Sequence, residues 1–113
     1  MYKFQAKLTA DGYCDNRAAG FCATATKLPN KEHGLAALCV KNNILNIYDV
    51  DLKNNLGKLL YKIELNKTEN LKIKSGLFCK TLKFDYLNNK YSFTNIAGVK
   101  YALDIIKEEA DKR

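Results

Sequence analysis

The sequence predicts one domain that is mainly antiparallel β, followed by a single C-terminal α-helix. Between Phe21 and Thr94, short apolar or alternating runs are separated by turns rich in Asn and Gly, which is typical of antiparallel strands. From Gly98 onward the apolar period changes from two to 3.6, the helical value. With 113 residues and 47% hydrophobic content, residues 1–113 are expected to form one globular domain around one core.

The first half of the chain predicts strands joined by polar turns. Tyr2 to Leu8 alternates apolar and polar residues, and residues 9–20 carry turn formers without periodicity. Phe21 to Leu28 resumes a strand that ends at Pro29. The first clear hairpin joins Gly34–Val40 to Ile44–Val50 through a turn that contains two asparagines, which tolerate left-handed backbone angles.

The second half shows the most regular alternation. Residues 59–65 and 71–74 place apolar side chains on one face and charged side chains on the other. Residues 77–86 and 91–94 predict a closing hairpin across a four-residue loop, 87–90. Lys80 falls on the apolar side of that pattern, which predicts a bulge or an open sheet edge there. The expected core members of this hairpin are Phe78, Leu82, Phe84, Tyr91 and Phe93.

The C-terminal segment predicts an amphipathic helix that packs on the sheet. Asn95 is expected to cap its N-terminus. The polar face is too acidic for an interfacial membrane helix, which is usually rich in Lys and Arg. The expected apolar stripe contains Val99, Ala102, Leu103, Ile106 and Ala110.

The net charge of +7 is concentrated in one region of the chain. Residues 53–90 contain nine lysines against three acidic residues. This excess allows either a solubilising lysine face or a patch for an anionic partner. On a strand-period interpretation, Lys62, Lys72 and Lys74 share the outward face of adjacent strands, with Lys58 and Lys67 at the neighbouring turns.

Catalytic and metal-binding signatures are weak, so we expect no enzyme, no cofactor and no metal site. His33 is the single histidine, and a pair with a cysteine thiol has no local motif to support it. The cysteines are too widely spaced for a usual zinc site. The glycines form no phosphate-binding loop, and most aromatic rings fall on the inward side of the strands, which disfavours nucleic acid.

The composition favours a cytoplasmic protein. No apolar stretch is long enough for a membrane span, and the first residues lack the apolar core of a secretory signal. We therefore expect the four cysteines (Cys14, Cys22, Cys39 and Cys79) to be reduced.

Three segments together resemble the bacterial pleckstrin-homology-like domains and their GRAM-like relatives. GLAALCVKNNILNIYDV looks like that family's strand-turn-strand, KLLYKIELNKTENLKIK looks like its paired short strands, and LKFDYLNNKYSFTNIAGVKYALDIIKE is similar to its closing hairpin and terminal helix. The resemblance covers about residues 21–107. It implies a strongly bent antiparallel sheet, or partly open barrel, closed at one end by the helix.

The same resemblance implies a non-enzymatic binding or scaffolding module. We expect it to act through contacts with another protein or a second copy of itself. The alternative is a peripheral binder of anionic lipid surfaces, and a small Cys-dependent enzyme ranks third. Family members that bind phosphoinositides carry a basic motif in the first hairpin, where this chain has Lys27, Lys31 and His33 but no arginine.

Overall fold

The computed structural model describes residues 20–27, 34–50, 56–76, 80–96 and 100–111. The predicted strand over residues 2–8 and nearly all of the predicted loop over 9–20 lie outside these ranges, as do Lys31 and His33.

Seven antiparallel strands form one sheet, which confirms the predicted fold class. Along the sheet, their order is β4-β3-β2-β1-β7-β6-β5. A short 3-10 turn, η1, separates β4 from β5, and the chain ends with helix α2. The bounds are β1 Gly20–Lys27, β2 Gly34–Lys41, β3 Ile44–Val50, β4 Leu56–Glu64, η1 Leu65–Lys67, β5 Glu69–Ser75, β6 Lys80–Tyr86, β7 Asn89–Ile96 and α2 Lys100–Ala110.

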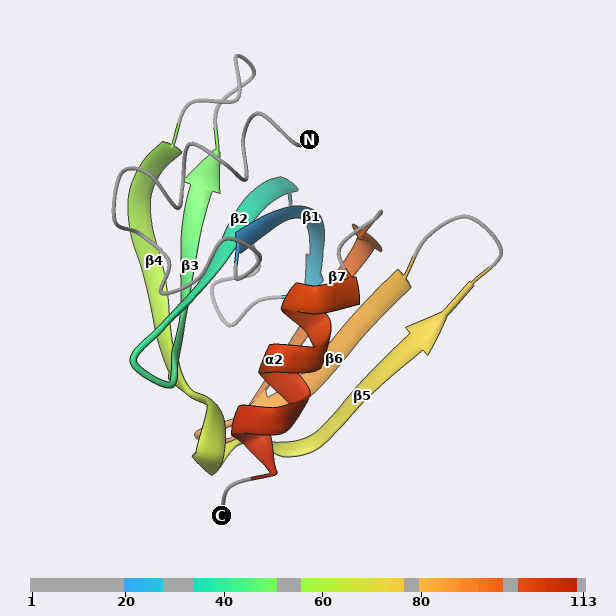
Figure 1. Ribbon diagram of the computed structural model, residues 1–113. Helices are drawn as coiled ribbons and strands as arrows, with labels where there is room; N and C mark the ends of the chain where they lie inside the picture. Colours follow the sequence, from blue (N-terminus) through green and yellow to red (C-terminus); the bar gives the residue numbers. More distant parts are fainter. Residues whose placement is uncertain (1–19, 28–33, 51–55, 77–79, 97–99, 112–113) are drawn as a thin grey trace.

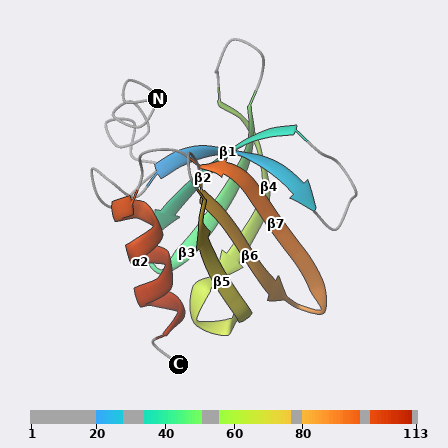
Figure 2. The same ribbon diagram turned by 90° about the vertical axis from the view of Figure 1, so that its right-hand side faces the viewer.

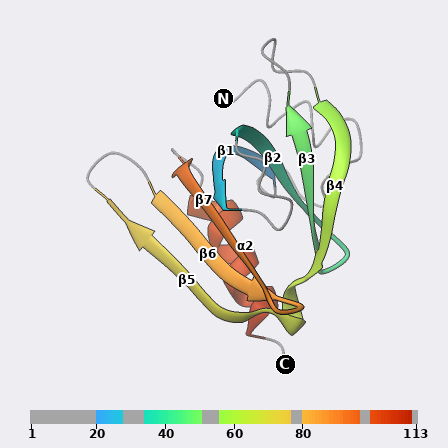
Figure 3. The same cartoon turned by 180° about the vertical axis from the view of Figure 1, so that it is seen from behind.

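The sheet is bent into two halves, β4-β3-β2-β1 and β7-β6-β5, which meet where β1 pairs with β7 (Figure 1). Strand β1 pairs with β2 on one side and with β7 on the other. Strands β4 and β5 follow each other along the chain but lie at opposite edges of the sheet, so the sheet does not close (Figures 1 and 3). Figure 2 shows α2 on one side of the molecule and β7 on the opposite side, which leaves the outer surface of β5, β6 and β7 uncovered by the helix.

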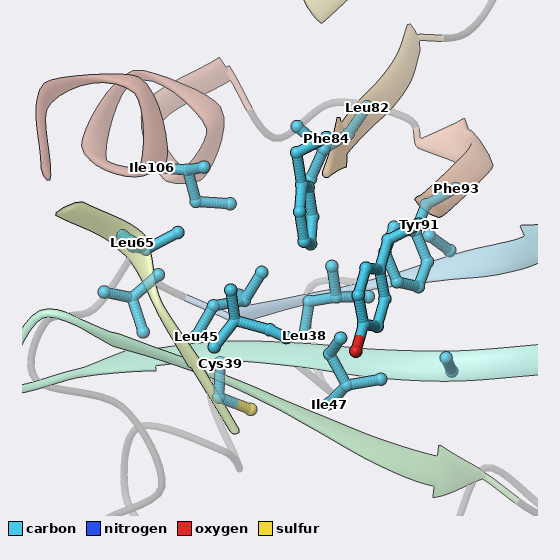
Figure 4. Packing of buried hydrophobic residues seen from close by; sticks show 14 of the residues in the cluster. Leu38, Cys39, Leu45, Ile47, Leu65, Leu82, Phe84, Tyr91, Phe93 and Ile106 are labelled. Atoms are coloured by element: carbon cyan, nitrogen blue, oxygen red, sulfur yellow. The ribbon is translucent and has the colours of Figure 1, made fainter. Parts of the chain in front are cut away.

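The interior of the bend holds the hydrophobic core. Predicted core members Leu82, Phe84, Tyr91 and Phe93 are buried, whereas Phe78 lies outside the described residues. From α2, the buried side chain of Ile106 points toward Leu65 and Phe84 (Figure 4). The buried members of the predicted helix stripe are Leu103, Ile106 and Ala110, and the side chains of Val99 and Ala102 are outside the description.

Two tight turns share the same left-handed geometry. Asn42 and Asn43 have φ of 53° and 66°, which suits a two-residue type I′ hairpin and confirms the predicted turn. In the closing hairpin, Leu87 and Asn88 have φ of 49° and 66°. Its loop is therefore two residues rather than the predicted four, because strand pairing continues to Tyr86 and Asn89.

The structure confirms the predicted irregularity in β6 but contradicts the predicted helix cap. The pairing of β6 with β7 shifts between Lys80 and Leu82, so the predicted irregularity at Lys80 is confirmed. The predicted N-cap at Asn95 is wrong, because Asn95 lies within β7 and its Nδ2 donates to Thr24 Oγ1 at 3.1 Å. Pairing with β1 holds this asparagine in the sheet, and α2 begins only at Lys100.

Candidate functional site

The predicted lysine face does not form as expected. Lys58 and Lys62 lie on β4, whereas Lys72 and Lys74 lie on β5, at the opposite edge of the sheet. The prediction that these strands are adjacent is wrong because η1 turns the chain away and β5 pairs with β6 instead. Lys67 is within η1, where its Nζ lies 3.4 Å from Glu64 Oε2.

The pairing of β5, β6, β7 and β1 brings together a different group of lysines on the exposed face of the sheet. Lys72 of β5 is directly opposite Lys83 of β6, and Lys83 is opposite Ser92 of β7. Ser92 is in turn opposite Lys27 at the end of β1. Residues directly opposite one another share a face of the sheet, so these four form one row across four strands.

This row lies in a shallow depression of about 540 Å³, which we call the cationic depression. Its lysines outnumber its one carboxylate, and it also offers two hydroxyls and a carboxamide. The lining residues are Thr26, Lys27, Asn70, Lys72, Lys83, Phe84, Asp85, Lys90 and Ser92.

The one carboxylate in the depression already has partners. Asp85 Oδ2 accepts a hydrogen bond from Asn70 Nδ2 at 2.9 Å, and Oδ1 lies 3.8 Å from Lys90 Nζ. These contacts leave Asp85 poorly placed to neutralise the other lysines. On the opposite side, Thr26 Oγ1 donates to Ser92 Oγ at 2.9 Å and to the Ser92 carbonyl at 3.2 Å.

Three ammonium groups in the depression have no carboxylate partner among the described residues. Within the described ranges, Lys27, Lys72 and Lys83 make no ion pair. Like charges directly opposite on neighbouring strands destabilise a sheet, and Lys72 and Lys83 are such a pair. A bound anion would relieve the repulsion between these two ammonium groups.

Sequence reasoning found part of this site. It singled out Lys72 and, separately, Lys27, but it missed Lys83 and Lys90. Lys83 sits on the outward side of the Phe84 strand, and its alternation was visible in the sequence. The sequence did not show that β5 pairs with β6 and that β1 pairs with β7, and these pairings place the lysines in one row.

The edge of β5 beside the depression is open. No strand in the described part of the chain pairs with its outer edge, as Figures 1 and 3 show from two sides. Leu71 and Ile73 are half-buried against the core, and Lys72 and Lys74 are exposed on the other face. The pairing of β5 with β6 shifts between Glu69 and Lys72, but residues 72–75 then pair in regular register, so this stretch of the edge can accept another strand.

The second open edge, on β4, is less regular. Its pairing with β3 shifts on both sides of Tyr48. Such bulges twist an edge away from further pairing. Inside the sheet, β4 is also tied to the core by an edge-to-face contact between Tyr61 and Tyr91, whose ring centroids are 5.5 Å apart.

Three tyrosines, Tyr61, Tyr86 and Tyr91, interact with one another in the described part of the interior. Burial raises the pKa of Tyr91 to about 12, and neighbouring Tyr61 and Tyr86 add to the shift. The Tyr86 hydroxyl donates to Glu64 Oε2 at 3.3 Å. Cys39 is fully buried and forms no disulfide, whereas the side chains of the other three cysteines lie outside the description.

Neither a cluster of metal ligands nor a membrane-spanning helix is present among the described residues. No three His, Cys, Asp or Glu side chains in these ranges come together as metal ligands would. None of the described helices has the length and apolar character needed to cross a bilayer.

Comparison with known proteins gives a structural neighbour. No family model and no curated protein matches the chain. Among solved structures, the inner membrane complex sub-compartment protein 3 from Toxoplasma gondii is similar over 90% of this chain and 82% of its own, with 12% identity and a TM-score of 0.48. At this identity and TM-score, nothing about the function of the chain follows from the likeness.

Proposed function

We propose that this chain is a pleckstrin-homology-like, non-enzymatic binding module that takes up an extended segment of a partner protein along the open edge of β5. The observation that carries the proposal is the edge of β5, which is unpaired within the described residues, is in regular register over residues 72–75 and has two faces that differ in character. The bent sheet and terminal helix agree with what the sequence resemblance implied. A cytoplasmic location, expected from the sequence, is part of the same proposal.

The two faces of β5 define the partner. An added strand hydrogen-bonds to the edge through its backbone and presents alternate side chains to opposite faces. Partner residues opposite Leu71 and Ile73 would pack against the core and should be apolar. Residues opposite Lys72 and Lys74 should be acidic, because opposite charges in cross-strand pairs stabilise by up to about 1 kcal/mol each. The fitting partner therefore alternates acidic and apolar residues.

The same lysines disfavour a second copy of the chain at this edge. An antiparallel pair of β5 strands centred on Ile73 would place Lys72 of each copy opposite Lys74 of the other. Such like-charge pairs are unfavourable, and lysines at edge strands are a common guard against self-association. Charge thus selects a different, acidic partner over self-pairing.

An anionic membrane surface is the second candidate. Leu87, 73% exposed at the turn beside Lys90, is the observation that favours it, because an apolar tip near cations suits a bilayer interface. Carboxylates adjoin this tip, however, since Glu69 and Asp85 line the same hollow. We rank the protein partner first for this reason.

The test is calorimetric binding of the full chain to a synthetic peptide that alternates glutamate and valine. The wild type should bind, and Lys72→Glu with Lys74→Glu should weaken binding by about tenfold or more, the effect of losing two cross-strand pairs. The matched control is Lys58→Glu with Lys62→Glu, which reverses two exposed lysines on the other edge strand.

The control separates local recognition from net charge. Equal losses in both double variants would show that only total charge matters and would remove the β5 proposal. Binding of the peptide after its valines are replaced by serine, with unchanged affinity, would also contradict it. Tight binding to anionic vesicles without any binding of the peptide would favour the membrane surface instead.

A further inference from the structure

We infer that the cationic depression is a seat for a phosphate monoester, carried by a phosphorylated serine or threonine of the partner segment. This inference rests on the proposed function, because the depression adjoins the β5 edge and shares Lys72 with it. It adds the chemical group that the partner presents.

The depression carries more positive charge than a single bound carboxylate would neutralise. Lys83 lies between the other two lysines of the row, with Lys72 on the neighbouring strand and Lys27 two strands away, about 10 Å at the usual strand spacing. All three are exposed, and their long side chains can converge on one ligand. A carboxylate brings one charge, which a single cross-strand lysine satisfies.

A phosphate monoester matches this excess. It carries about −1.5 to −2 charge near neutral pH and three strong acceptor oxygens. Hydrogen bonds between ammonium groups and such oxygens are among the strong ones in proteins. The Ser92 and Thr26 hydroxyls lie in the same depression and supply further donors once their mutual hydrogen bond opens.

The position of the depression favours a phosphoprotein over a phosphorylated lipid. An added strand at β5 points its acidic-face side chains toward the outer surface of the sheet, where Lys72 lies. Exposed large apolar side chains in the described part of the chain are Leu35, Leu59 and Leu87, and none lines the depression. A bilayer would therefore find no apolar anchor within it.

The experiment uses the full chain at constant ionic strength and compares two versions of the alternating peptide, with a central serine or phosphoserine. We expect the phosphoserine peptide to bind at least about tenfold more tightly, as one added charge-assisted contact predicts. Lys27→Gln with Lys83→Gln should abolish this preference while leaving the serine peptide bound, because neither lysine belongs to β5. Lys58→Gln with Lys62→Gln should retain it.

Inorganic phosphate serves as an independent probe. In NMR titrations it should shift the backbone amides of Lys27, Lys72 and Lys83 in the wild type, whether or not the β5 edge binds a peptide. If these amides do not respond, the lysines only solubilise the protein and the inference is overturned. If the amides respond but the serine peptide does not bind any form, the β5 proposal fails while the anion seat stands.

Vesicles distinguish the source of the phosphate. Phosphatidylcholine vesicles with and without a phosphatidylinositol phosphate are pelleted with the wild type and with the Lys27→Gln, Lys83→Gln variant. Equal, low pelleting supports the phosphoprotein. Pelleting that requires the phosphorylated lipid and both lysines, without preference for the phosphopeptide, would overturn the inference in favour of a lipid headgroup.

Discussion

Replacing Ile106 by alanine tests whether α2 closes the core as the structure shows. Ile106 is fully buried and faces Leu65 and Phe84 across the interior (Figure 4). The substitution removes three carbon groups, worth roughly 0.8 kcal/mol each in burial, and leaves a cavity at a site held by the sheet. We expect a loss of about 3 kcal/mol in the free energy of unfolding. This is a large part of the 5–15 kcal/mol that stabilises a typical domain.

Equilibrium denaturation in urea, followed by circular dichroism, measures this loss. The control is Lys107→Ala, which changes the exposed neighbour on the same helix and should alter stability by no more than about 0.5 kcal/mol. A double-mutant cycle with Leu65→Ala should give a coupling of at least about 0.5 kcal/mol, as expected for residues in contact. A loss below about 1 kcal/mol for Ile106→Ala, with an unchanged denaturant slope, would refute the packing of α2 described above.

Three further predictions concern the closing hairpin and its outer face. Leu87→Asn should raise stability by about 1 kcal/mol, because Leu87 is 73% exposed yet held at φ 49°, a conformation that asparagine tolerates better; an unchanged or lower melting temperature would contradict this. The pKa of Tyr91 is raised to about 12, so its contribution to stability is complete below pH about 10 and is lost as pH rises toward 12. Alkaline unfolding of Tyr91→Phe should lack this component, and an identical pH profile would count against it. Lys83→Gln should leave thermal stability unchanged or slightly raised, since it removes the repulsion from Lys72; clear destabilisation would show that Lys83 has a structural role.

Local patterns were enough to predict several elements of this fold. The alternation around Phe84, the asparagine pair at Asn42 and the change to a helical period after Gly98 each depend on neighbours within a few residues. Each was recovered in the structure as a strand, a turn or a helix. The predicted bulge at Lys80 followed from the same logic, because a lysine on an apolar face forces a local change of register.

Long-range pairing was beyond the same reasoning. Alternation assigns Lys62 and Lys72 to outward faces but does not say which strands lie side by side, and they proved to be at opposite edges. Lys27 and Lys83 lie in one row only because β1 and β6 both pair with β7. Asn95 was wrongly predicted for a related reason. Its side chain could cap a helix, but it hydrogen-bonds instead to Thr24, 71 positions away in the chain.

Hydrogen exchange at the β5 backbone tests the central claim most directly. Exchange of the amides of residues 69–75 is followed by NMR in the full chain, with and without the alternating acidic peptide. We predict that the amides of β5 that face its open edge become protected when the peptide is bound, while those of β4 keep their rates, because an added strand hydrogen-bonds to the edge it joins. Bound peptide with unchanged exchange along β5, or with protection along β4 instead, would contradict the account.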